Sequence, residues 1–276
     1  MSGAGRISSG VRSDRASSPR PAARDPAPSR RWRAVAQAAL VTLVLLALWE
    51  GLVRLLALPP FILPGPLRVG RALIENAGLI AYHTGITAVE VALGLVIGAG
   101  LGAATAIGIA VSPLARAFIR PALIVTQALP VFALAPILTL WFGYGMASKI
   151  VMAVLIIYFP VTSSFFDGLM RTPQGWLDLG HVMGATPRQA MWRIRVPAAI
   201  PSLASGLRLA AVYAPIGAVI GEWVGAAGGL GYLMLLANGR AKTDLMFAAL
   251  IVLALLALLL YRLVGAACDR LTARME

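Results

Sequence analysis

The residues that could do chemistry are the few ionisable side chains that fall inside long apolar stretches. Three glutamates have this position, Glu50, Glu90 and Glu222. A charged group is costly in a hydrocarbon environment, so its presence there usually reflects a function. Glu222 precedes a glycine-rich run, and we interpret it as a gate or docking point or as part of a structural turn. Glu90 is either a solvated residue at the end of a span or a pathway residue.

Two acidic residues have a candidate basic partner four residues away. A helix would place Glu50 and Arg54 on the same face, so we expect an ion pair between them. Asp167 precedes Arg171 by the same spacing, and we expect it to lie at the membrane surface.

Uncharged polar residues add pathway candidates, namely Gln127, Ser163, Ser164 and Tyr213. A polar side chain in an apolar helix either lines a pathway or hydrogen-bonds to a neighbouring helix, and both interpretations stay open. The aromatic side chains of Trp141 and Tyr144 offer stacking surfaces for a planar heterocycle. For these two residues we favour membership of an aromatic belt at the membrane interface.

Several chemistries have no counterpart in the sequence. It contains no Gly-x4-Gly-Lys-[Ser/Thr] loop for nucleotide phosphates, no His-Glu-x-x-His pair and no Gly-x-Ser-x-Gly nucleophile. Cys268 is the single cysteine, and His83 and His181 are too far apart in sequence to indicate a metal pair. We therefore expect no catalytic residue, no metal and no cofactor on this chain.

The composition indicates a membrane protein. The 276 residues are 59% hydrophobic and only 13% charged, with a mean hydropathy of +0.82. Soluble enzymes and nucleic-acid binders carry about a quarter charged residues, so those classes are disfavoured. The net charge of +13 is concentrated in residues 1–33, which hold eight of the 24 basic residues. We expect these residues to form a disordered cytoplasmic tail and residues 34–276 to form the transmembrane domain.

About 20 apolar residues are needed to cross a bilayer as a helix. The sequence predicts an all-α polytopic protein with about six such helices, at residues 34–56, 84–111, 117–141, 146–167, 204–224 and 245–267. The first apolar run is too long for a cleaved secretory signal. With the N-terminus inside, 18 of the 24 basic residues fall on the cytoplasmic side, so we expect both termini to be cytoplasmic.

The longest predicted loop, residues 171–203, differs from its surroundings in its charges and prolines. Thr186 is a suitable N-cap, and Pro187 fits the first position of a helix. We expect two short helices at the membrane surface, joined by a turn at Gly184, Ala185 and Thr186. The second helix should stop before Pro197.

This loop resembles the coupling loop of ABC-importer permeases, which has the pattern Glu-Ala-Ala, three residues, Gly, nine residues, Ile, one residue, Leu-Pro. Here Gly184 is followed after nine residues by Ile194, Arg195, Val196 and Pro197, and Asp178 stands where the glutamate would be. Leu179 and Gly180 replace the two alanines. The resemblance implies that residues 176–197 dock on an ATP-binding subunit, with contacts from Asp178, Gly184, Ala185, Thr186, Arg188, Ile194 and Pro197.

The resemblance covers about residues 35–270 and is closest to the permeases for sulfonates, taurine, nitrate and thiamine precursors. The segments ILPGPLRV, QALPVFALAPILTLWFGYG, FPVTSSFFDGL and APIGAVIGEWVGAAGGLGYLML are typical of that branch. Glu90, four residues before Gly94, and the stretch LANGRAKTDLMFAAL are similar to permeases for hydroxymethylpyrimidine-type thiamine precursors. A sulfonate, taurine or nitrate substrate is the alternative.

Membership of this family would imply a multi-pass protein of the bacterial inner membrane that works by alternating access. It would form a homodimer in the lipid bilayer, with an ATP-binding subunit below and a substrate-binding protein outside, and no nucleic-acid partner. An ion-coupled secondary transporter or channel is the alternative from another class, and it would need paired ionisable groups within the membrane. A membrane enzyme is a third hypothesis without a recognisable catalytic set.

Overall fold

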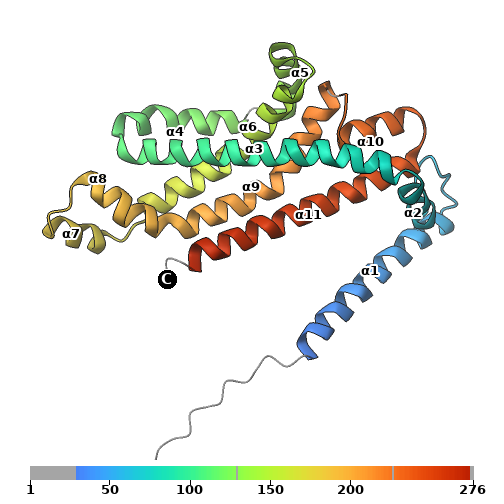
Figure 1. Ribbon diagram of the computed structural model, residues 1–276, viewed down its shortest axis with the longest axis horizontal. Coiled ribbons are helices and arrows are strands. Elements are labelled where there is room, and N and C mark those ends of the chain that lie inside the picture. Colours follow the sequence, from blue (N-terminus) through green and yellow to red (C-terminus); the bar gives the residue numbers. More distant parts are fainter. Residues whose placement is uncertain (1–28, 129, 226, 274–276) are drawn as a thin grey trace, which may run out of the picture. The chain divides into compact units, whose positions relative to one another are not determined.

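The computed structural model describes residues 29–128, 130–225 and 227–273, and every secondary-structure element in this part of the chain is helical (Figure 1). The predicted tail over residues 1–28 lies outside the described residues. The chain divides into two compact units, which meet between Leu48 and Trp49. The helices are α1 (Ser29–Leu55), α2 (Pro66–Glu75), α3 (Ala77–Val111), α4 (Pro113–Ala128), α5 (Val131–Phe142), α6 (Met146–Met170), α7 (Gln174–Val182), α8 (Pro187–Ala190), the π-helical turn η1 (Met191–Arg195), α9 (Val196–Gly225), α10 (Leu230–Gly239) and α11 (Thr243–Ala273).

Five of these segments are long and apolar enough to cross a membrane by length and composition. They are Val35–Leu55, Ala77–Val111, Met146–Met170, Pro187–Gly225 and Thr243–Ala273. The prediction of a polytopic all-α protein is confirmed. Residues 29–33 belong to α1, so the helix begins earlier than the predicted boundary of the tail. These five residues include three arginines, which favour helix formation.

The predicted third span, residues 117–141, is wrong as a single helix. The structure places these residues in α4 and α5, which are 16 and 12 residues long. Pro130 is the N-cap of α5, and its backbone is extended. Proline has no N–H to donate and clashes with the preceding turn, so a helix tends to break at it. Pro121 and Pro136, in contrast, lie within helices.

The helix after Gly184 also differs from its prediction, because it does not stop before Pro197. It starts at Pro187, widens into the π-helical turn η1 and continues as α9 to Gly225. The Val196 N–H donates to the Met191 carbonyl, five residues earlier. This wider turn allows the helix to continue through Pro197, which lies directly after it. One helical rod therefore joins the surface loop to the bundle.

The centre of the bundle is α6, which packs between α3 and α9 (Figure 1). Small residues allow these helices to come very close, as is common in membranes. A Cβ atom added to Gly94 of α3 would lie 2.5 Å from the Ala153 Cβ of α6. On the other side, a Cβ at Gly217 of α9 would lie 2.8 Å from the Ala153 Cα. Ala153 is therefore the point at which all three helices meet.

A second core lies at the end of the bundle that carries α2 and α10. Val69 and Ala72 of α2 pack with Ile80 of α3 and with Leu230 and Leu233 of α10. The α2 helix is amphipathic, because Val69 and Ala72 are buried while Arg68, Arg71 and Glu75 are exposed. This core fixes the short helices against α11 at the end opposite to α7 and α8.

We predict that Gly217→Ala destabilises the protein, because the new methyl group would overlap the backbone of α6 at Ala153. Overpacking of this kind costs about 1–3 kcal/mol. Gly100→Ala is the matched control, since nothing lies within 4 Å of its added Cβ and alanine favours the helix. Reversible unfolding of both variants in detergent would measure the difference. Equal stabilities would contradict the close α6–α9 contact.

Candidate functional site

The turn after α7 has the geometry that the sequence predicts. Gly184 has a φ of 78°, a left-handed conformation that suits glycine. Its N–H donates to the His181 carbonyl at 2.9 Å, and the Ala185 N–H donates to the Gly180 carbonyl at 2.9 Å. These two bonds form a Schellman motif that closes α7. Nothing lies within 4 Å of a Cβ added to Gly184, so the backbone conformation, not packing, requires glycine here.

Thr186 caps the next helix as predicted. Its Oγ1 accepts a hydrogen bond from the Gln189 N–H at 3.3 Å, and the Gln189 Oε1 accepts from the Thr186 N–H at 2.8 Å. This reciprocal pair is a capping box, and Pro187 occupies the first helical position. The loop therefore has a defined shape on both sides of the turn.

The departure from the Glu-Ala-Ala pattern has a structural reason at Gly180. A Cβ added to this buried glycine would lie 2.7 Å from the Ile194 Cδ1. Glycine therefore lets α7 approach the rod formed by α8, η1 and α9. Asp178 lies two residues earlier in an exposed position, where it accepts a hydrogen bond from the Gln174 side chain at 3.2 Å.

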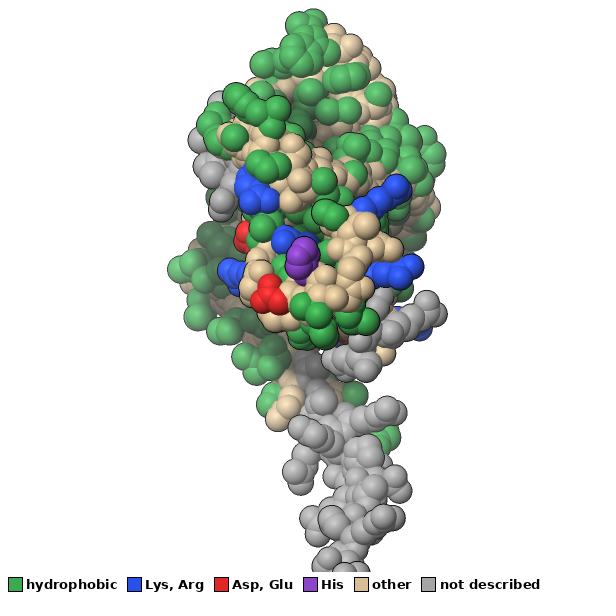
Figure 2. All heavy atoms as spheres, turned by 90° about the vertical axis from the view of Figure 1, so that its left-hand side faces the viewer, with side chains coloured by type: hydrophobic (Ala, Val, Ile, Leu, Met, Phe, Trp, Pro, Cys, Tyr) green, Lys and Arg blue, Asp and Glu red, His purple; other side chains and the backbone are tan. Residues whose placement is uncertain are grey.

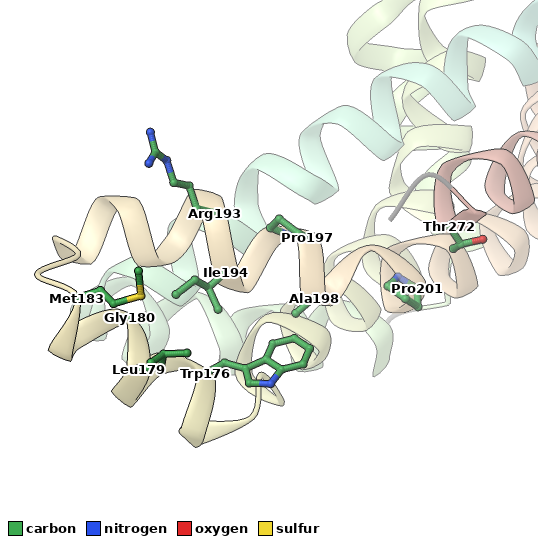
Figure 3. Close-up of a pocket in the computed structure, with 10 residues that line it drawn as sticks. All are labelled: Trp176, Leu179, Gly180, Met183, Arg193, Ile194, Pro197, Ala198, Pro201 and Thr272. Atoms are coloured by element: carbon green, nitrogen blue, oxygen red, sulfur yellow. The ribbon is translucent and has the colours of Figure 1, made fainter. Parts of the chain in front are cut away.

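A groove runs between α7 and the rod (Figure 3). Its walls are mainly apolar, and Thr272 of α11 lies at one end. Figure 3 shows Arg193 pointing away from the groove, while Ile194 points into it. The other lining residues are Trp176, Leu179, Gly180, Met183, Pro197, Ala198 and Pro201.

The end of the molecule that carries α7 and α8 combines exposed apolar and basic groups. Figure 2 shows basic side chains around a histidine at this end, with apolar side chains between them. Val182 and Met183 are 84% and 77% exposed, and Trp176 is 55% exposed. Arg188 is also exposed. These apolar side chains are accessible to a partner at this end of the molecule. We name the exposed residues of α7, the turn and α8 the loop surface.

The structure places Glu90 and Glu222 inside the bundle. Glu90 is 0% exposed and Glu222 is 1% exposed. The interpretation of Glu90 as a solvated residue at a span end is therefore wrong, because α6 and α9 cover it. In this conformation neither carboxyl group faces an open surface of the chain.

The two glutamates belong to a buried polar cluster that connects α3, α6, α9 and the start of α10. The Lys149 Nζ of α6 forms an ion pair with the Glu90 Oε1 of α3 at 2.8 Å. The Glu222 carboxylate of α9 accepts hydrogen bonds from the Thr87 hydroxyl at 2.6 Å and from the Gly231 N–H. We name Thr87, Glu90, Lys149 and Glu222 the polar cluster.

The polar cluster also holds the turn between α9 and α10. The Leu230 N–H donates to the Thr87 Oγ1 at 2.8 Å, and the Gly229 N–H donates to the His83 Nδ1 at 3.0 Å. Gly229 has a φ of 111° and lies against the Glu222 carboxylate, which leaves no room for a side chain. Glu222 therefore contacts the turn between α9 and α10, and a role as a gate or docking point stays a prediction.

The remaining pathway candidates that the structure describes have different surroundings. Ser163 lines a small cavity with Asp167 and Thr162. Ser164 packs against Gly206 in the contact between α6 and α9. The Tyr213 side chain is 39% exposed. The Gln127 side chain lies outside the described residues.

Other sequence predictions concern exposed residues. The Arg54 Nε and the Glu50 Oε1 form an ion pair at 2.6 Å, which confirms that prediction. Trp141 and Tyr144 are 72% and 76% exposed at the end of α5. This exposure fits both an aromatic belt at the membrane interface and a stacking surface for a ligand.

Among the described residues, no group of three or more His, Cys, Asp or Glu side chains is arranged to hold a metal ion.

Comparisons with known proteins agree on one family. Residues 94–275 match the family described as "Binding-protein-dependent transport system inner membrane component". A probable ABC transporter permease protein of Haemophilus influenzae is 50% identical over 80% of this chain and 91% of its own length. The formylaminopyrimidine transport permease protein ThiX of Halalkalibacterium halodurans is 36% identical over 80% of this chain and 88% of its own length.

One further relative is named for a different compound, and a solved structure has a similar fold. The riboflavin transport system permease protein RibX of Chloroflexus aurantiacus is 36% identical over 85% of this chain and 88% of its own length. A structure of the MetNI methionine ABC transporter in an inward-facing conformation has a TM-score of 0.53 at 22% identity. The match covers 77% of this chain and 98% of that chain. At this identity the structural likeness supports the fold alone.

We predict that Gly184→Ala loosens the turn of the loop surface. A side chain in the left-handed region costs about 1–2 kcal/mol, which should open the Schellman motif. Amide hydrogen exchange at Gly180–Ala185 would then become faster. The control is Gly175→Ala in α7, where a Cβ meets nothing within 4 Å and the φ is ordinary. If both variants exchange like the wild type, the turn does not depend on glycine.

We predict that Lys149→Met destabilises the protein by about 3–5 kcal/mol, because it leaves buried carboxyl groups without their cation. Arg54→Met is the matched control. It removes the cation of a pair whose arginine side chain is 78% exposed, so its effect should stay below about 1 kcal/mol. Chemical unfolding in detergent micelles measures both values. A small effect of Lys149→Met would show that the buried pair contributes little.

Proposed function

Because the chain belongs to the family of binding-protein-dependent transport system inner membrane components, and is a permease subunit of an ABC importer, we propose that it imports a pyrimidine-type thiamine precursor. Two relatives with this degree of similarity, at 36% identity, are named for formylaminopyrimidine and for riboflavin. Both compounds contain a pyrimidine ring, which in riboflavin is fused to two further rings. The taurine permease of Escherichia coli is 29% identical, which makes a sulfonate the second candidate.

The aromatic residues at the end of α5 support a planar cargo. Trp141, Phe142 and Tyr144 are 72%, 48% and 76% exposed. Exposed ring faces stack on a flat heterocycle and give a tetrahedral sulfonate no comparable contact. Although the sequence alone favours an interfacial belt for Trp141 and Tyr144, we propose that these side chains face the pathway in the assembled importer, where a second copy of the chain completes it.

The ATP-binding subunit docks on the loop surface in this proposal. The observation that carries the assignment is the combination of the Schellman turn at Gly184 with the capping box at Thr186, which presents Val182 and Met183 outward. Ala185 belongs to the same turn, and Asp178 and Arg188 supply charges at its edges. Ile194 packs against α7 at Gly180, and Pro197 lines the groove beside it. ATP and magnesium bind to the partner, and this chain performs no bond chemistry.

The continuous rod explains how the partner can move the bundle. The α8, η1 and α9 helices form one unbroken helical segment, Pro187–Gly225. A displacement of the loop surface therefore moves α9, and α9 carries α6 with it through their close contact. Closure of the partner dimer would bias the bundle between two arrangements, which is what alternating access requires.

The assembly has a defined orientation in this proposal. The protein spans the inner membrane several times, and the loop surface and both termini lie in the cytoplasm. A substrate-binding protein delivers cargo at the opposite end, near α2 and α10. Two copies of the chain enclose the pathway within the bilayer.

The test is uptake by proteoliposomes that hold the chain, its ATP-binding subunit and its binding protein. We predict ATP-dependent uptake of hydroxymethylpyrimidine that excess taurine does not inhibit. Gly184→Val should abolish uptake while Gly175→Ala should not, because only the first distorts the docking turn. Inhibition by taurine with no pyrimidine uptake would favour the sulfonate class. Uptake that needs an ion gradient and no ATPase would overturn the importer assignment for this chain.

A further inference from the structure

The charges of the polar cluster do not balance when every group is ionised. Glu90 and Glu222 carry two negative charges, and Lys149 is the only basic group that a described contact brings to them. The three side chains are at least 94% buried. A net charge in such surroundings is very unfavourable, so buried ionisable groups tend to reach neutrality by gaining or losing a proton.

The hydrogen bonds differ between the two carboxyl groups. The Glu222 oxygens accept from the Thr87 hydroxyl and the Gly231 N–H, as expected of an ionised carboxylate. The Glu90 Oε1 accepts from Lys149, but the Glu90 Oε2 is fully buried and has no hydrogen-bond partner among the described residues. A buried oxygen of this kind calls for an explanation.

The Glu222 carboxyl group is close enough to the Glu90 carboxyl group for a hydrogen bond between the two side chains. Thr87 and Glu90 are three residues apart on one face of α3, and Thr87 already contacts Glu222. Two ionised carboxylates cannot form such a bond, because neither has a hydrogen to donate.

We propose that the polar cluster is a proton-binding site, in which Glu90 carries one proton on its free oxygen and donates it to the Glu222 carboxylate. The cluster is then neutral, with one ammonium, one carboxylate and one carboxylic acid. The buried oxygen gains a partner, and the proton forms a direct link between α3 and α9. This site goes beyond the transport function and does not depend on the identity of the cargo.

Other titratable groups near the site do not replace this proton. Lys149 comes from α6 and Glu222 from α9, while His83 lies further along α3. His83 accepts from the Gly229 N–H through Nδ1 and has its ring beside Tyr232 of α10. A metal cation between the two carboxyl groups is the competing occupant, and it would remove the need for the proton.

The test is infrared spectroscopy of the full chain in lipid nanodiscs with ¹³C-labelled glutamate. We expect a carbonyl band of a protonated glutamic acid at neutral pH, where a glutamate in water is ionised. Glu90→Gln and Glu222→Gln should each remove it, since one carboxylate paired with Lys149 then remains. Glu50→Gln is the control and should leave the band, because Glu50 pairs with an exposed arginine. If the variants do not fold, an alkaline titration of the wild-type band takes their place.

A stability measurement tests the same site independently. The folded chain holds a proton that the unfolded chain releases, so thermal stability should fall as the pH rises through neutrality. Glu90→Gln keeps the hydrogen-bond donor without a titrating proton and should flatten this slope. The proposal is overturned if the wild type lacks the acid band, or if Glu90→Gln leaves it unchanged. It is also overturned if sodium at constant pH stabilises the wild type but not Glu90→Gln, because a metal cation would then fill the gap.

Discussion

The close approach of α6 to α3 and α9 is the constraint on which the other features depend. Gly94 and Gly217 allow both neighbouring helices to contact Ala153 from opposite sides. Helices in a membrane gain little from burying apolar groups, so such contacts supply much of their association energy. The same contact aligns Lys149 with Glu90 and Glu222, one turn from Ala153 along α6. The packing of small residues thereby brings the buried side chains of the polar cluster together.

The loop surface and the polar cluster lie at opposite ends of the same two helices. The α9 helix begins at Val196, directly after η1, and reaches Glu222 near its other end, while α6 has Lys149 near its start and ends at Met170. The two sites are therefore connected through covalent helix and close helix contacts, without an intervening flexible segment. A movement of the loop surface can reach the polar cluster only if α6 and α9 move together. Transmission between the two sites therefore depends on the contact between these two helices.

The sequence predicts the features that depend on local chemistry, and it fails where distant segments meet. The turn at Gly184 and the helix start at Thr186 and Pro187 are predictable, because each depends only on residues a few positions away in the sequence. The Lys149–Glu90 pair joins residues 59 positions apart, and only the packing of α6 on α3 brings them together. The signal for this pair in the sequence is Lys149 itself, because lysine is rare in this chain and this lysine lies within an apolar stretch. The prolines at 121, 130 and 136 are visible in the sequence, but which of them breaks a helix depends on tertiary context.

The π-helical turn η1 determines in which direction each side chain of α9 points around the helix axis. Successive residues of an α-helix are about 100° apart around its axis, so one residue more or less turns every later side chain by that angle. One face of α9, which includes Gly206 and Gly217, packs on α6. Its orientation relative to the loop surface therefore depends on the wide turn at Met191–Arg195. A single-residue deletion there would preserve nearly all of the sequence yet direct the wrong face of α9 toward its neighbours. We expect the fold to tolerate a change of residue type in this turn more readily than a change of length.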